Sequence, residues 1–227
     1  MFKNWNVCTD QSSGMVPGMN TFPVTLSGKR VRLEPLALSH VSALWRAASE
    51  SAENYRLTSV PASEADMRAY VETALADAAK GLFVPFATVD LVRDRVVGAT
   101  RFATLERWSW PTPPKDPRPF YDGVEIGWTW LAASAQRTHV NSEAKLLMLT
   151  HAFEVWRVRR VMLKTDSRNS RSRNAMLRMG AKFDGVIRAA MPAFDGGIRD
   201  SAYFSILESE WPEVKSHLTK LVSRDSA

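Results

Sequence analysis

The order of apolar and polar residues in the first third of the chain predicts one strand followed by two helices. Residues 31–36 alternate between apolar and polar types, as the residues of a half-buried strand do. Ser39 then precedes an apolar pattern with helical spacing. Ser63, with an aspartate three residues later, resembles a capping box and predicts a second helix that ends near Gly81.

The next segment predicts two strands and then a long loop. Residues 83–91 and 96–105 have strand-like composition and are separated by a charged turn. Residues 107–123, RWSWPTPPKDPRPFYDG, contain five prolines, which exclude a regular helix or a central strand. Such a long connection is often functional, and the alternative is a dispensable insertion.

A central strand, a helix and a further strand follow the loop. Residues 124–131 alternate in the manner of a strand, and Trp128 and Trp130 fall on one face, where we expect both to be in the core. A helical apolar stripe begins near Asn141, and residues 160–165 form the next predicted strand. The strand–loop–helix–strand order implies that the two strands are parallel.

The last part of the chain predicts a short helix, a hairpin and a final helix. Residues 170–179 have helical character, and residues 186–194 and 199–207 are separated by a turn with the sequence DGG. The final helix is expected to begin near Glu210, with a proline in its first turn. The complete order predicts an α/β (α+β) fold with a mixed, mostly antiparallel central sheet flanked by helices.

Composition bounds the domain organisation. The chain has 227 residues, of which 45% are hydrophobic and 24% charged, which is enough for one substantial core. We expect a flexible tail over residues 1–23 and a single domain over residues 24–227, with Met19 as an alternative start. Cys8 is the only cysteine, so cysteines can form neither a disulfide nor a zinc site. Without a long apolar run or a signal peptide, the sequence predicts a cytoplasmic protein with no membrane association.

Residues 136–144, QRTHVNSEA, suit the binding of phosphate groups. They form a short polar loop that leads into an amphipathic helix between two predicted strands. The first N–H groups of a helix have no intrahelical partners, and the helix dipole adds partial positive charge there. Arg137 adds a full positive charge, so this loop could bind a pyrophosphate.

A second segment, residues 166–183 with the sequence DSRNSRSRNAMLRMGAKF, joins a strand end to a short helix. Together with the phosphate loop it resembles the GNAT N-acyltransferases. In that family Gln/Arg-x-x-Gly-x-Gly/Ala opens the main acyl-CoA helix, and a later Asn-x-x-Ser helix carries catalytic groups. The resemblance is greatest to the RimJ/RimL type, which acetylates protein N-termini. It extends from residue 24 through 123–131 to 199–212, and so covers nearly the whole chain.

The resemblance implies an acyl-CoA-dependent N-acetyltransferase (EC 2.3.1.-) that uses a ternary complex and no metal. The acetyl-CoA would lie at the splay between the central parallel strands. The positions that match the family at the cofactor are Trp130, Leu131, Gln136, Arg137, Thr138, His139, Val140, Asn141, Ser142, Asn169 and Arg173.

Acyl transfer to an amine requires a neutral amine, a stabilised oxyanion and a protonated leaving thiolate. Model amines have pKa values from about 8 to about 10.4, so a base must remove a proton. Glu125 matches the family position from which a glutamate faces the acceptor; its alternative role is a structural ion pair with a neighbouring arginine. The family pattern offers Ser172 for the thiolate and Asn169 for the pantetheine arm, with helix capping as their alternative role. Backbone N–H groups near Trp130 and Leu131 would meet the oxyanion.

Three positions depart from the family pattern. Met176 stands where many members have a tyrosine that protonates the thiolate. His139 and Asn141 stand where glycine or alanine normally lets phosphates approach the backbone. We expect Asn141 to cap the helix, whereas His139 is either a solvated imidazole or a phosphate ligand.

The acceptor is left open by the sequence. A protein N-terminus follows from the resemblance, and a small amine, including an antibiotic amine, is the alternative. Tyr55, Trp108 and Trp110 are candidates for the acceptor wall, with ordinary packing as the other interpretation. Because the loop at 107–123 carries four aromatic residues, we expect it to pack over the acceptor cleft or against the other subunit of a homodimer.

The charge distribution is compatible with coenzyme A binding. The net charge is +6, and ten Lys or Arg residues between 157 and 188 face only Asp166 and Asp184. Arginines suit the phosphates of coenzyme A. A basic face also suits nucleic acid, but no recognisable reading motif accompanies it. A protein that senses acyl-CoA or binds nucleic acid without turnover is therefore the alternative of a different class.

Overall fold

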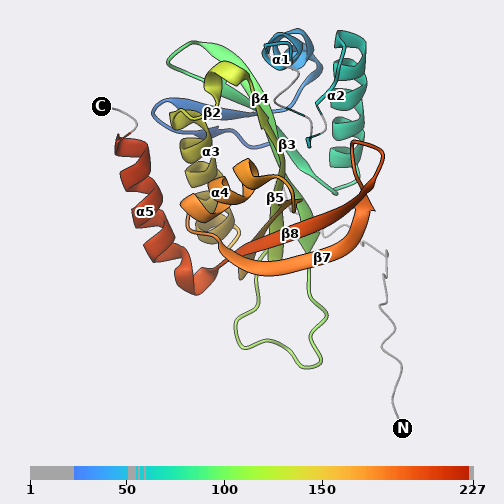
Figure 1. Ribbon diagram of the computed structural model, residues 1–227. Helices are drawn as coiled ribbons and strands as arrows, with labels where there is room; N and C mark the ends of the chain where they lie inside the picture. The colour runs from blue at the N-terminus through green and yellow to red at the C-terminus, as the bar shows by residue number, and fades with distance from the viewer. Residues whose placement is uncertain (1–22, 51–54, 56, 59, 225–227) are drawn as a thin grey trace.

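The computed structural model describes residues 23–50, 55, 57–58 and 60–224. Eight strands form one sheet in the order β1-β2-β3-β4-β5-β6-β8-β7 (Figure 1). The strands are β1 (Leu26–Ser27), β2 (Val31–Pro35), β3 (Val84–Asp90), β4 (Arg95–Glu106), β5 (Gly123–Leu131), β6 (Arg160–Asp166), β7 (Lys182–Pro192) and β8 (Ile198–Leu207). All neighbouring pairs are antiparallel except β5 and β6, which confirms the predicted mixed sheet.

Five α-helices cover the sheet: α1 (Val41–Ala48), α2 (Glu64–Ala79), α3 (His139–Thr150), α4 (Ser170–Arg178) and α5 (Trp211–Arg224). Helices α1 and α2 lie on one face, and α3 and α5 lie on the other (Figure 1). The core on the α3 face includes Phe102, whose ring centroid lies 4.6 Å from that of Trp156. On the α2 face, Met67 and Val71 are fully buried. The apolar stripes of the helices therefore face the core, as the sequence pattern predicted.

The pairing of β5 with β6 is short, and this opens the sheet. Only Gly123, Val124 and Glu125 of β5 have partners on β6. Beyond them β5 continues beside β4, while β6 pairs with β8 as far as Asp166. The two strands thus separate toward their C-terminal ends, as the resemblance to the GNAT N-acyltransferases implied. Part of the β5 backbone is left without a strand partner on the side that faces β6.

A bulge in β5 changes which way its tryptophans face. Ala99 pairs with Trp130 and Arg101 with Gly127, so two residues of β5 stand opposite one residue of β4. Trp128 sits in the bulge with φ of +50°, a rare conformation for a large side chain. As a result Trp130 is buried while Trp128 is 40% exposed. The expectation that both tryptophans lie in the core was therefore wrong for Trp128.

Helix starts were predicted with mixed success. Ser63 caps α2, as expected, by accepting a hydrogen bond from the Asp66 N–H. Thr138, not Asn141, caps α3: its side chain accepts from the Val140 N–H, and Asn141 lies inside the helix. The sequence reading misplaced this cap because both residue types are good caps. A π-helical turn, η4 (His151–Val155), continues α3.

The proline-rich segment forms an irregular loop at the N-terminal end of β5 (Figure 1). Arg118 of this loop forms a two-pronged ion pair with Glu208. The guanidinium of Arg159 lies 4.9 Å from the ring centroid of Trp110. These contacts attach the loop to the start of β6 and the end of β8. Its proposed packing over an acceptor stays a prediction.

Some predictions concern residues that the structure does not describe. The N-terminal tail up to residue 22, including Cys8 and Met19, lies outside the described residues. Within the described residues, no helix combines the length and the apolar character that a membrane span requires.

Candidate active site

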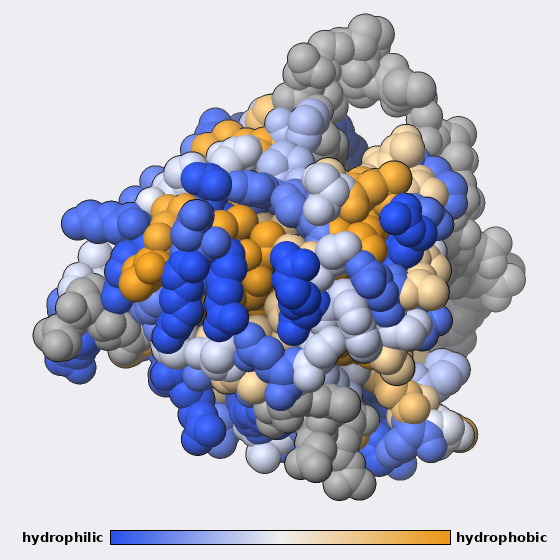
Figure 2. Space-filling model, turned by 90° about the horizontal axis from the view of Figure 1, so that it is seen from above, coloured by the Kyte–Doolittle hydropathy of each residue, from blue (hydrophilic) through white to orange (hydrophobic). Residues whose placement is uncertain are grey.

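The loop that leads into α3 stands at the open end of the separation between β5 and β6. A short 3₁₀ helix, η3 (Ala133–Ala135), connects β5 to this loop. Arg137 is exposed and has φ of +60°, so the chain turns sharply before Thr138. The N–H groups of the first turn of α3 face this end of the molecule, apart from that of Val140, which Thr138 caps. Seen from this end, hydrophilic side chains surround patches of apolar surface (Figure 2).

Gln136 connects the two sides of the opening. Its amide Nε2 donates to the carbonyl oxygen of Leu131 at 2.9 Å, and its Oε1 accepts from Arg171 Nη1 at 2.7 Å. Arg171 belongs to the first turn of α4, which follows β6. The structure therefore adds Arg171 to the cationic residues at the opening; the sequence reading passed over it because arginines are frequent throughout this segment.

His139 and Asn141, which stand where the family has glycine or alanine, differ in how deeply they are buried. His139 is only 8% exposed, and its Nε2 lies 3.5 Å from Oδ1 of the buried Asp90. The expectation of a solvated imidazole was wrong, because the first turn of α3 packs against the end of β3. Val140 and Ser142 are also buried, and Asn141 is half-buried. His139 and Asn141 therefore offer backbone N–H groups to a ligand, whereas Thr138 caps the Val140 N–H and the Ser142 N–H lies beyond the unpaired first turn.

Glu125 is buried at the closed end of the separation, where β5 and β6 are still paired. Its Oε2 accepts a hydrogen bond from Thr104 Oγ1 at 2.9 Å and forms an ion pair with Lys164 Nζ at 2.9 Å. Its side chain is 2% exposed. Thr104 has φ of +46°, so its contact with Glu125 depends on a strained backbone. The structural ion pair expected as the alternative exists, with lysine in place of arginine.

Helix α4 begins with a cap at Asn169. The Asn169 side chain accepts from the Ser172 N–H at 3.0 Å, so its capping role is established by geometry. The Ser172 hydroxyl is half-buried on the same turn. Arg173 donates from Nη1 to the Ser167 carbonyl oxygen at 3.1 Å. Met176, at the position of the family tyrosine, is buried in the core.

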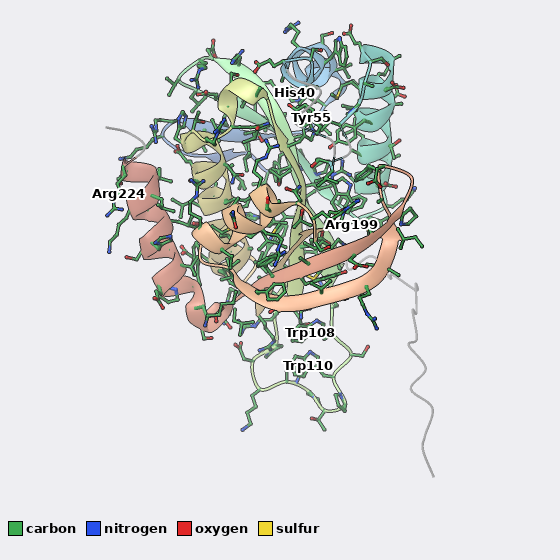
Figure 3. All side chains as sticks on the ribbon, in the orientation of Figure 1. His40, Tyr55, Trp108, Trp110, Arg199 and Arg224 are labelled. Carbon is green, nitrogen blue, oxygen red and sulfur yellow. The ribbon has the colours of Figure 1, made fainter. Side chains whose placement is uncertain are left out.

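The three acceptor-wall candidates lie at opposite ends of β5. The Tyr55 hydroxyl donates to the Leu131 carbonyl oxygen at 2.9 Å, and its ring contacts Trp130 edge-on. Burial, followed by the charge of Glu50, raises the pKa of Tyr55 to about 12. Trp108 and Trp110 lie at the other end of the molecule (Figure 3), beside the start of β5. The three residues therefore do not form one wall.

Sequence comparison identifies the family. A model of the acetyltransferase (GNAT) domain matches residues 30–182. The chain belongs to the GNAT family of acetyltransferases. No curated protein matches the chain. The family match makes the chain an acetyl-CoA-dependent acetyltransferase, and it leaves the acceptor undetermined.

Solved structures of GNAT proteins have the same fold. A GCN5-related N-acetyltransferase from Brucella melitensis is 26% identical, with a TM-score of 0.74 over 88% of this chain and 85% of that chain. Mycobacterium smegmatis RimJ, solved with CoA-disulfide, is 18% identical, with a TM-score of 0.72 over 88% and 95%. RimL, a ribosomal L7/L12 α-N-protein acetyltransferase solved with coenzyme A, is 18% identical, with a TM-score of 0.65 over 81% and 98%. At 18% identity the similarity concerns the fold.

The donors at the opening fit acetyl-CoA. Beyond Glu125 the backbone of β5 has no strand partner on the β6 side, and this edge suits the amides of a pantetheine arm. The first turn of α3 suits a pyrophosphate, and Arg137 and Arg171 supply positive charge beside it. The indole Nε1 of Trp130 is buried without a hydrogen-bond partner among the described residues. These groups match the chemistry of the cosubstrate without requiring the family glycines.

The sequence reading also missed the partners of Glu125. Lys164 and Thr104 come from the strands on either side of β5, so only the sheet register brings them to Glu125. A signal was present for Lys164, because it is a charged residue inside a short, mostly apolar strand that the sequence places beside the central strand. No pattern in the sequence marked Thr104.

Proposed function

We propose that this acetyltransferase transfers the acetyl group from acetyl-CoA to a primary amine in a direct ternary complex, with Glu125 as the group that accepts the amine proton. The observation that carries the proposal is the position of Glu125. It is the last residue of β5 that pairs with β6, and its carboxylate is held between Thr104 and Lys164. The loop that leads into α3, residues 136–141, stands at the other end of the same opening and is called the cosubstrate loop below.

The proposed reaction has three steps. Glu125 accepts a proton from the ammonium form of the acceptor, directly or through water, because a protonated amine has no lone pair for attack. The amine nitrogen then attacks the thioester carbonyl carbon, and backbone N–H groups near Trp130 and Leu131 stabilise the oxyanion. The C–S bond breaks as the amide forms, and the nitrogen loses its second proton, which replaces the proton that the coenzyme A thiolate takes.

Ser172 is the proposed donor of that last proton. It stands one residue after Arg171, which the hydrogen bond to Gln136 connects to the cosubstrate loop. The Asn169 side chain fixes the Ser172 N–H, and this turn would place the Ser172 hydroxyl at the thiolate. Asn169 and Arg173 would contact the pantetheine arm from the same turn. These roles rest on the family pattern and on the location of α4 after β6.

A protein N-terminus is the acceptor that the RimJ/RimL resemblance favours. RimL, a structural neighbour, is a ribosomal-protein N-terminal acetyltransferase. A small amine is the second candidate, and a cavity beside Trp128, described below, is of a size that such a molecule fills. Acyl-CoA sensing or nucleic-acid binding without turnover is the alternative of a different class, and it predicts no thiol release with any amine.

The test combines an amine panel with substitutions at the proposed catalytic groups. Release of coenzyme A thiol is followed with N-terminal peptides and small amines. Glu125→Gln should retain acetyl-CoA binding and lower kcat by about 10²- to 10⁴-fold, with a smaller deficit at high pH, where the amine is already neutral. Ser172→Ala should have a milder effect, because water also protonates a thiolate whose parent pKa is about 8.5.

Glu72→Gln is the matched control, because Glu72 is an exposed glutamate on α2. It should retain full activity. Activity of Glu125→Gln within a few-fold of the parent at neutral pH would assign the base elsewhere. Wild-type turnover in Ser172→Ala would leave Ser172 with a structural role.

A further inference from the structure

Arg101 of β4 is a buried charge without a polar partner among the residues that the structure describes. The residue is 5% exposed. Its guanidinium carbon lies 5.2 Å from the ring centroid of Tyr70 and 5.1 Å from those of Phe83 and Trp128. Among the described residues, no carboxylate or carbonyl accepts a hydrogen bond from Arg101. Buried charges in proteins are normally paired, and a guanidinium has five N–H donors that aromatic faces do not saturate.

The guanidinium faces a cavity of about 470 Å³ between α2 and the bulge of β5. The cavity is lined by the three aromatic residues, by Arg101, and by Asp66 and Asp77. This volume is in the range of small-molecule sites. Asp66 accepts a hydrogen bond from Ser63, and Asp77 forms an ion pair with Lys80 at 3.1 Å. In the part of the chain that the structure describes, neither aspartate forms an ion pair with Arg101.

The cavity adjoins the proposed catalytic glutamate. Trp128 is the shared wall: Arg101 lies over its ring, and Lys164 Nζ is 6.0 Å from the centroid of the same ring. Lys164 in turn pairs with Glu125. One indole ring and one lysine thus connect the buried guanidinium to the carboxylate that would receive the amine proton.

We propose that this cavity binds an anionic group of the acceptor, so that the acetylated amine belongs to a molecule with a carboxylate or a phosphate. Arg101 would bind the anion through paired N–H donors, and Tyr70, Phe83 and Trp128 would contact the apolar part of the same molecule. The anion can be the acidic side chain of an N-terminal peptide or the carboxylate or phosphate of a small amine. This inference rests on the proposed function for the amine, but the anion site itself does not.

Matched acceptor pairs test the proposal. The panel contains ω-amino carboxylates with their carboxamides, aminoalkyl phosphates, and short peptides with Glu or Gln near the N-terminus. Wild-type kcat/KM should favour the carboxylate or phosphate member by about 10- to 100-fold, as expected for hydrogen bonds to a charged group. In Arg101→Met this preference should disappear while the carboxamide members react as before. Arg68→Met, at an exposed position of α2, should retain the preference.

A binding measurement separates the anion site from the enzymatic activity. Phenylacetate and phenyl phosphate should raise the melting temperature of the wild type, phenylacetamide should not, and Arg101→Met should lose both shifts. Anion binding without turnover of any amine would support the site and count against the proposed function. Equal kcat/KM within the pairs, together with no melting shift, would overturn the anion site. If Arg101→Met is unfolded, Arg101→Lys decides, because it keeps the charge but loses the paired donors and should weaken the preference.

Discussion

Lys145 of α3 offers a direct test of the interior of this fold. Its amine is completely buried. Nζ donates to Thr129 Oγ1 at 2.6 Å and to Thr100 Oγ1 at 3.3 Å, beside the β5 bulge. No acidic group pairs with it among the described residues. Burial therefore lowers the pKa of Lys145 from 10.5 to about 7.

This shift makes stability depend on pH in a defined direction. The unfolded chain binds the Lys145 proton up to about pH 10.5, whereas the folded chain releases it near pH 7. Between these values the unfolded state holds more protons, so the free energy of unfolding rises with pH. The full difference is about 5 kcal/mol at 1.36 kcal/mol per pH unit, and the part between pH 7 and pH 9 is about 2 kcal/mol. Below pH 7 the whole penalty is present.

Urea unfolding at pH 7, 8 and 9, followed by circular dichroism, measures the effect. The wild type should gain about 2 kcal/mol over this range relative to Lys145→Met, which has no titrating amine at this position. Loss of the bonds to the two threonines shifts the stability of the variant by a constant amount and leaves the slope unaffected. Lys80→Met, at an exposed lysine, should follow the wild-type slope. Parallel curves for wild type and Lys145→Met would refute the reasoning.

Two further predictions concern the cosubstrate loop and the proline-rich loop. Arg137→Ala should weaken acetyl-CoA binding roughly tenfold, measured by calorimetry, because it removes a positive charge at the proposed phosphate site. Arg157→Ala is the control and should have no effect. Both arginines are exposed and have positive φ, +60° and +56°, so the backbone cost of alanine is similar and the two variants differ in where the charge is lost. Equal affinities would place the phosphates elsewhere. Replacing residues 109–120 by a short Gly-Ser turn should raise the acceptor KM or change the mass in light scattering, with acetyl-CoA affinity nearly unchanged. If neither changes, the loop is a dispensable insertion.

Local patterns were sufficient to predict most of the fold. The alternation in residues 31–36 gives β2, the cap at Ser63 gives α2, and the strand–helix–strand order around α3 gives the parallel pair. Strand alternation and helix caps are determined by residues only a few positions apart, so they can be recognised in the sequence itself. The family motif added the proposed location of the cosubstrate loop, in which Thr138 caps α3 in place of Asn141 and His139 is buried.

The parts of the candidate site that the sequence did not reveal depend on which residues of different strands lie side by side in the sheet. Glu125 was identified, but its partner Lys164 comes from β6 and Thr104 from β4. Arg101 resembled any arginine of a half-exposed strand, and only the three-dimensional packing places the rings of Tyr70, Phe83 and Trp128 around it. A sequence pattern cannot reveal that a charge lacks a partner, because partners are defined by three-dimensional contacts.

The bulge in β5 interrupts the alternation of its side chains between the two faces of the sheet, and this determines where Trp128 lies in the candidate site. A regular strand would have turned Trp128 to the same face as Trp130 and into the core, as the periodicity predicted. The bulge instead exposes the Trp128 ring, so that both Arg101 and Lys164 lie over it. Gly98 permits this geometry, because a side chain there would collide with the Trp130 carbonyl group on the facing strand. A positive φ at a bulky residue is costly, and here the strained residue forms the wall between the proposed catalytic carboxylate and the proposed anion cavity.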